Sequence, residues 1–314
     1  MSDLFQNLTN TNPELFLQKN DPNDIRLGKT VSNTTYENSQ IVIIGFLSDE
    51  GIMRSGGRGG AALAPDAIRE QFYQLTPFGI SVEICDLGNI EVQDSLENTH
   101  NVLNEKIKLI LNDNKKIIVL GGGNDISYPS GCAMADIYGG TNWLGVNVDA
   151  HFDVSVANQI NSETPFRQLL DEKRIRPDYF YEIGFQRHFV SPIYYRNLQG
   201  LGVNLSSLEQ IRSRDTAELE LREMMREKFI NHSKSLSTFF SFDMSVVRSA
   251  DAPGTTDPSP LGLRAGEFIV LVKFAASLAN TRIIQFTEVN PKFDRDNRTT
   301  KLVAIGMHRF CSNL

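Results

Sequence analysis

Three side chains that can bind a metal ion stand two residues apart in the segment 149–153. Asp149, His151 and Asp153 follow a mostly apolar run, Trp143 to Val148, which predicts a buried strand. In extended chain, side chains two residues apart point to the same side. The pattern therefore presents carboxylates and an imidazole together, a donor set that suits a divalent cation such as Mn²⁺. The alternative is a loop with a few polar residues, since short Asp and His clusters are common.

The elements around this motif alternate between strand and helix patterns. Short β-branched or apolar runs predict strands at 41–46, 82–86, 116–120, 143–148, 179–184, 202–205, 237–243 and 282–288. Amphipathic or apolar segments predict helices at 65–72, 97–111, after 125, and at 166–170, 216–232, 263–278 and 299–310. This alternation predicts one α/β domain over 41–314, with three α/β/α layers and a mainly parallel central sheet. Residues 1–40 are expected to form an N-terminal arm, with Leu15 to Leu17 docked on the body.

Polar side chains follow four of the predicted strands. Asn124 follows the strand at 116–120, the 149–153 motif follows the strand at 143–148, and Asp243 and Glu288 end two later strands. Ligands of open α/β sheets bind at the carboxyl ends of the strands. We therefore expect these groups to lie along one edge of the sheet.

Composition excludes several classes of partner. The 314-residue chain carries a net charge of −7 and no basic stripe, so nucleic acid is not expected. No stretch approaches 18 apolar residues, so no membrane span is expected. Three widely spaced cysteines and a polar start predict reduced thiols and a cytoplasmic location. The glycine-rich loop at 54–62 lacks both dinucleotide and P-loop patterns, which disfavours nucleotide binding.

Several motifs, in order, resemble the arginase superfamily from about residue 41 to the C-terminus. They are Gly56-Gly-Arg-Gly-Gly-Ala-Ala, Leu120-Gly-Gly-Gly-Asn-Asp, Val148-Asp-Ala-His-Phe-Asp, Thr164-Pro-Phe-Arg-Gln-Leu-Leu, Ser241-Phe-Asp, Ala252-Pro-Gly-Thr and the run from Glu288 to Thr299. Within the superfamily the chain looks most like formimidoylglutamase. The resemblance implies hydrolysis of a C–N bond in a linear amidine, N-formimidoyl-glutamate, to glutamate and formamide. It also implies two Mn²⁺ ions, a small-molecule substrate and, since relatives are often oligomers, a homo-oligomer.

The resemblance also implies roles for individual residues. Asp149 and Asp243 would bridge both ions, His151 would bind one ion, and Asp153 would bind the other. Asp153 would also accept a hydrogen bond from the attacking hydroxide and handle its proton. Glu288 would face the cationic end of the substrate.

Two further residues are candidates for binding substrate. Arg167 would hold a substrate carboxylate, unless it is an ordinary arginine on a surface helix. His188 would face the cleft, unless it is an ordinary loop histidine.

Two positions depart from the family pattern. Asn124 stands where relatives have histidine, and Ser245 stands where they have aspartate. Each ion would lose one ligand, so we expect one Mn²⁺ or none and an activity that is weak or absent. Three hypotheses stay open: a formimidoylglutamase with a weakened metal site, an inactive descendant that binds a small molecule or partner, and a hydrolase of another linear amidine or amide.

Overall fold

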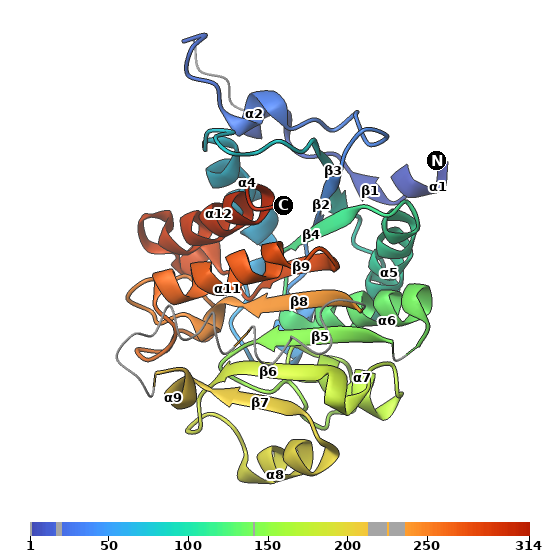
Figure 1. The fold of residues 1–314 in the computed structure, drawn as a ribbon, viewed down its shortest axis with the longest axis vertical. Coiled ribbons are helices and arrows are strands. Elements are labelled where there is room, and N and C mark those ends of the chain that lie inside the picture. Colours follow the sequence, from blue (N-terminus) through green and yellow to red (C-terminus); the bar gives the residue numbers. More distant parts are fainter. Residues whose placement is uncertain (1, 17–20, 141, 213–224, 226–235) are drawn as a thin grey trace.

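A mainly parallel sheet forms the centre of the protein (Figure 1). The computed structural model describes residues 2–16, 21–140, 142–212, 225 and 236–314. These residues form a nine-stranded sheet in the order β1-β3-β2-β4-β9-β8-β5-β6-β7. Every neighbouring pair is parallel except β1 with β3. The predicted fold class is therefore confirmed.

The strands follow the apolar runs of the sequence. Their bounds are β1 Leu8–Thr9, β2 Ile41–Phe46, β3 Ile84–Ile90, β4 Lys116–Leu120, β5 Trp143–Val148, β6 Phe180–Phe185, β7 Asn204–Ser207, β8 Ser237–Asp243 and β9 Thr281–Thr287. All residues of β2, β3, β5 and β6 are buried, as expected of parallel strands that helices cover on both faces. The polar groups that follow β4, β9, β8 and β5 therefore meet at one edge, because these strands are neighbours in this order.

Helices cover both faces of the sheet (Figure 1). On one face α4 (Ala64–Tyr73), α11 (Ala265–Ser277) and α12 (Arg298–Cys311) pack together, and on the other α5 (Leu96–Asn112), α6 (Ser127–Tyr138) and α7 (Pro165–Asp171) do so. The remaining α-helices of the described residues are α1 Ser2–Phe5, α2 Leu27–Thr30, α3 Glu50–Arg54, α8 Pro192–Leu201 and α9 Leu208–Ile211. The two apolar clusters on either side of the sheet bury its side chains, and this burial is the main stabilising contribution.

The described residues that precede β2 contribute to the body of the protein. Strand β1 pairs with the end of β3, and Leu4, Leu27 and Tyr36 are buried. Leu15 and Phe16 pack against the core, and the Phe16 ring stacks on Tyr73 with centroids 4.8 Å apart. Leu17 and the helix predicted at 216–232 lie outside the described residues, apart from the buried Met225.

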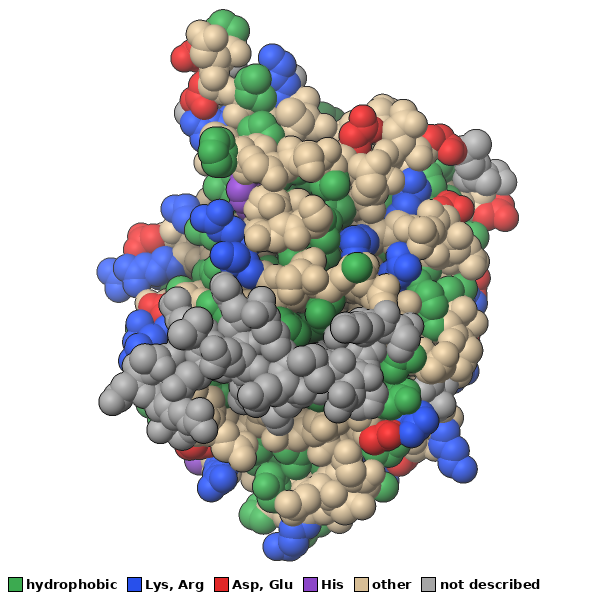
Figure 2. Space-filling model, viewed as in Figure 1, with side chains coloured by type: hydrophobic (Ala, Val, Ile, Leu, Met, Phe, Trp, Pro, Cys, Tyr) green, Lys and Arg blue, Asp and Glu red, His purple; other side chains and the backbone are tan. Residues whose placement is uncertain are grey.

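The surface carries charges of both signs. On the face shown in Figure 2, Lys and Arg side chains lie at several separate places, some of them beside acidic side chains. Among the described helices, none is both long enough and apolar enough to cross a membrane.

Candidate metal centre

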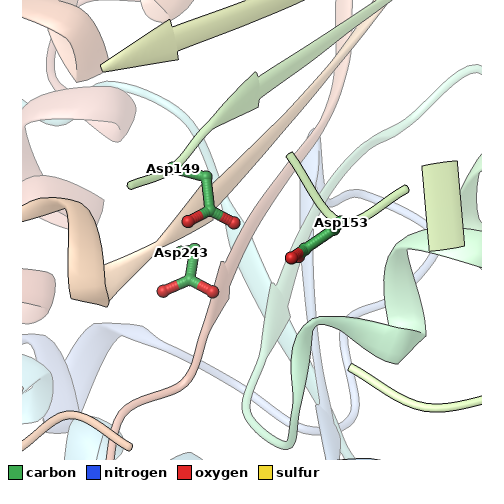
Figure 3. Close-up of side chains that lie close together, drawn as sticks. All are labelled: Asp149, Asp153 and Asp243. Atoms are coloured by element: carbon green, nitrogen blue, oxygen red, sulfur yellow. The ribbon is translucent and has the colours of Figure 1, made fainter. Parts of the chain in front are cut away.

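Three buried carboxylates converge at the carboxyl ends of β5 and β8. Asp149 follows β5, Asp153 lies in the loop beyond it, and Asp243 ends β8. Their carboxylates point into a common space (Figure 3), and oxygen atoms of the three lie within 4.8 Å of one another. The sequence places Asp149 and Asp153 near each other, and the sheet brings in Asp243 because β8 pairs with β5 in parallel.

The carboxylates of this cluster are buried and carry like charges when ionised. Burial, and then the charge of Asp149, raise the pKa of Asp153 and of Asp243 well above the usual range. Like charges in a low-dielectric site favour either protons or a bound cation. Closely spaced, buried oxygen donors suit a hard divalent ion, so the residues fit Mn²⁺.

His151 lies beside the carboxylates. Its Nδ1 is 3.4 Å from Asp149 Oδ1, and its Nε2 is 3.5 Å from Asp257 Oδ2. Burial would lower the pKa of His151, but the contacts with Asp149 and Asp257 outweigh it and raise that pKa to about 12. These contacts favour the imidazolium form, and a metal ion that binds the ring would displace a proton.

Asn124 points its amide nitrogen toward the carboxylates. Its Nδ2 donates to Asp153 Oδ2 at 2.5 Å and to Asp149 Oδ2 at 3.4 Å. Its Oδ1 accepts hydrogen bonds from the hydroxyls of Ser127, Ser241 and Thr287 at 2.8 to 3.1 Å. The carbonyl oxygen, the one atom of Asn124 that could bind a metal ion, therefore faces away from the cluster.

A glutamine fixes this orientation. Gln285 donates through Nε2 to the hydroxyls of Ser127 and Ser241, so each hydroxyl accepts from Gln285 and gives its own proton to Asn124. Turning the Asn124 amide over would place its NH₂ against three hydroxyls, two of which already accept from Gln285. Asn124 thus acts as a hydrogen-bond donor to the cluster.

Ser245 takes a different position in the same cleft. Its side chain is 2% exposed, and its Oγ has no hydrogen-bond partner among the described residues. Its backbone N–H donates to Asp243 Oδ1 at 2.7 Å. Ser245 can therefore offer a neutral oxygen donor, which binds a cation more weakly than a carboxylate.

Glu288 directs its carboxylate into the same cleft. The backbone N–H of Asn124 donates to Oε1 at 2.7 Å, and the Thr256 hydroxyl donates to Oε2. Burial raises the pKa of Glu288 to about 8, although these two hydrogen bonds lower it. Glu288 and Asp153 both have positive φ, 61° and 50°, a strained conformation that is frequent at functional sites.

A cleft of about 570 Å³ opens over the cluster. Its lining includes His151, Asp153, Asp243, Ser245 and Glu288, with an apolar side that Phe189 and Tyr194 help to form. The sequence-predicted metal ligands and Glu288 are thus brought together.

Two predicted substrate residues lie elsewhere. Arg167 Nε pairs with Asp171 at 2.6 Å on α7, and Arg167 lines a neighbouring hollow that shares Tyr194 with the cleft. His188 is exposed and packs on Phe189, with ring centroids 4.4 Å apart.

Two residues of the cleft were missed by sequence reasoning. Arg58 comes from the glycine-rich loop, donates to the Thr255 carbonyl and packs on the Phe293 ring, with its guanidinium carbon 3.9 Å from the ring centroid. Asp257 lies two residues beyond the Ala252-Pro-Gly-Thr motif. The signals were a lone arginine among glycines and an acid just past a matched motif.

A family model and several known proteins match most of this chain. The model of the arginase family matches residues 39–311. The chain belongs to the arginase family. Arginase-family relatives include formimidoylglutamase of Staphylococcus carnosus, 31% identical over 85% of this chain and 84% of that protein, and formimidoylglutamase of Staphylococcus haemolyticus, 27% identical over 96% and 99%.

Solved structures of arginase-family members are similar as well. Trypanosoma cruzi formiminoglutamase with two Mn²⁺ ions is 30% identical, has a TM-score of 0.84, and is matched over 92% of this chain and 98% of that one. A variant of the same protein, with histidine in place of an asparagine, was also solved with two Mn²⁺ ions. Its TM-score and identity are the same, and the match spans 93% of this chain and 98% of that one. The resemblance drawn from the motifs is therefore confirmed.

Proposed function

We propose that this protein is a Mn²⁺-dependent hydrolase of formimidoylglutamase type whose metal site is weakened by Asn124 and Ser245. The observation that carries the proposal is the convergence of Asp149, Asp153 and Asp243 in a cleft that also contains Glu288. Identities of 27–31% to formimidoylglutamases support the reaction type. A cation held there supplies charge for polarising the substrate and an activated water at neutral pH.

The residues of the cleft have complementary tasks. Asp149, Asp243 and His151 would hold the cation, and Asp153 would share in this and accept the proton of the attacking water. Asn124 keeps Asp153 in place through its 2.5 Å hydrogen bond. Glu288, which accepts hydrogen bonds from Asn124 N–H and Thr256, would face the cationic amidine carbon and nitrogens.

A second candidate function rests on the direction of the Asn124 amide. A hydrogen-bond donor that faces Asp149 and Asp153 partly replaces a cation, which also fits a non-catalytic protein that binds a small molecule in the cleft. Metal binding and hydrolysis separate the two candidates.

The experiment measures bound Mn²⁺ and hydrolysis of formimidoylglutamate by the full chain. We expect weak binding that needs added Mn²⁺, since losing outer-shell partners of metal ligands already costs about 10–100-fold in affinity, and losing ligands costs at least as much. We expect slow hydrolysis that depends on the added Mn²⁺. The positive control is the double variant Asn124→His, Ser245→Asp, which restores both ligand types. No binding by the wild-type protein at millimolar Mn²⁺ would leave the non-catalytic candidate. Bound Mn²⁺ without hydrolysis of formimidoylglutamate would overturn the proposed substrate and leave either the non-catalytic candidate or a hydrolase of another linear amidine or amide.

For the substrate carboxylates, we propose Arg58 as a partner in addition to the earlier candidate Arg167. Arg58 lines the cleft, and its buried Nε has no hydrogen-bond partner among the described residues. Arg167 is already paired with Asp171. Arg58→Ala should raise KM about tenfold or more, because a charged hydrogen bond is worth about 1.5–3 kcal/mol, while Arg167→Ala should change KM less than twofold. The opposite ranking in steady-state kinetics would return the role to Arg167.

A further inference from the structure

His151 is held between two carboxylates on opposite sides of its ring. Nδ1 faces Asp149, one of the three clustered carboxylates, and Nε2 faces Asp257, which comes from the loop that follows β8. The ring also packs against Phe189, with centroids 5.2 Å apart. Its two nitrogens therefore face different neighbours: Nδ1 faces the carboxylate cluster, and Nε2 faces away from it.

A histidine that binds a metal ion through one nitrogen commonly donates the other N–H to a carboxylate. This outer hydrogen bond fixes the tautomer and the ring orientation and makes the metal-facing nitrogen a better donor. We propose that Asp257 is a positioning residue of the metal centre, which accepts the N–H of His151 Nε2 so that Nδ1 faces the cation. The inference rests on the proposed function, because it requires that a cation binds beside Asp149.

Ser245 provides a second, independent observation on the same side of the site. Its Oγ is buried, has no hydrogen-bond partner among the described residues, and lines the cleft together with His151 and Asp257. A neutral hydroxyl therefore stands where the family resemblance implies an aspartate. Asp257 returns one negative charge to this side, in addition to Asp149, Asp153 and Asp243.

The loop that carries Asp257 is anchored to the site. The Thr256 hydroxyl donates to the Glu288 carboxylate, and the Thr256 backbone N–H donates to the Glu288 carbonyl at 3.0 Å. The Asp257 side chain itself is 63% exposed. Substituting Asp257 should therefore leave the fold intact, because exposed ion pairs contribute little to stability.

The experiment titrates the full-length protein with Mn²⁺ by calorimetry and measures thermal unfolding without metal. Asp257→Asn should weaken Mn²⁺ binding about 10–100-fold, while its metal-free unfolding temperature shifts by less than about 2 °C. Asp257→Glu keeps the carboxylate and should recover most of the affinity. The matched control is Glu163→Gln, which removes one exposed negative charge from the lining of the same cleft and should change affinity less than about twofold.

Each other outcome has a defined meaning. Unchanged Mn²⁺ affinity in Asp257→Asn would overturn the inference while leaving the proposed function intact. An equal loss in Glu163→Gln would also overturn it, because the effect would then be general attraction by the cleft. Failure of the wild-type protein to bind Mn²⁺ would overturn the proposed function and, with it, the role of Asp257.

Discussion

Buried acids in two regions of this protein, Asp86 in β3 and the cluster at the carboxyl ends of β5, β8 and β9, differ in how their charge is balanced. Asp86, fully buried in β3, is held by Arg69, whose Nε and Nη2 donate to its two oxygens at 2.7 and 2.9 Å. Tyr73, Thr11 and the Gly88 N–H complete its hydrogen bonds. This group is satisfied entirely by the protein itself.

The acids at the carboxyl ends of β5, β8 and β9 have no such partner. Among the described residues, no Lys or Arg forms an ion pair with Asp149, Asp153, Asp243 or Glu288, and His151 is the cationic group that contacts Asp149. Glu182, buried in β6 beside Asn147, adds another carboxyl whose pKa is raised by burial and by Asp149. Buried charge that the protein balances serves the fold, whereas buried charge left unbalanced marks a site for a cation or protons.

Replacing one acid in each region by asparagine should give the largest difference, measured as the change in the free energy of unfolding. Asp86→Asn removes the buried carboxylate that pairs with Arg69 and leaves the partly exposed Asp66, 3.3 Å away, as its remaining ion-pair partner, so we expect the free energy of unfolding to fall by about 3–5 kcal/mol. Asp243→Asn removes one of several repelling charges, so in the absence of metal the free energy of unfolding should stay unchanged or rise by up to about 1 kcal/mol. Urea unfolding of metal-free protein measures both. A comparable loss in Asp243→Asn would mean that the second group is also balanced from within.

The stability of metal-free protein should also depend on pH, with a smaller effect than these substitutions. Glu288 titrates at about 8 in the folded protein, against an ordinary value of 4.5, and Asp153 and Asp243 shift in the same direction. The folded state thus binds more protons than the unfolded state between these values. The resulting stability is fully present below about pH 4.5 and is lost as pH rises through about 8.

We therefore expect the unfolding temperature of metal-free protein to fall by about 3–6 °C between pH 5.5 and 8.5. Saturating Mn²⁺ should reduce or reverse this fall, because the cation favours the ionised carboxylates. Glu288→Gln in the absence of metal is the control and should reduce the pH dependence, with Asp153 and Asp243 supplying the rest. The same fall with and without Mn²⁺ in a thermal scan would contradict the assignment of these acids to a cation site.

The bounds of β3 could not be predicted from the local sequence pattern. A strand is predicted at 82–86, but β3 runs from Ile84 to Ile90, where β2 pairs with it on one side and Leu8 and Thr9 of β1 pair with Ile90 and Asn89 on the other. That partner lies some eighty residues earlier in the chain. The apolar period of 82–90 by itself does not reveal the pairing.

The sequence by itself determined the fold class, the family and the clustering of acids at one sheet edge. Alternating periodicities imply parallel strands, and parallel strands bring their carboxyl ends together. The short spacing of Asp149, His151 and Asp153 sets their proximity. The sequence also predicts that Asn124 and Ser245 stand at two ligand positions of the family, and this stays a prediction.

The tertiary structure alone decided which atoms face the site. Asn124 turns its amide nitrogen inward because hydroxyls from three separate elements, at Ser127, Ser241 and Thr287, surround its carbonyl. Asp257 contacts His151 although about one hundred residues separate them in the chain. The direction of a side chain in a crowded site depends on all of its neighbours at once, and those neighbours are adjacent only after the sheet has formed.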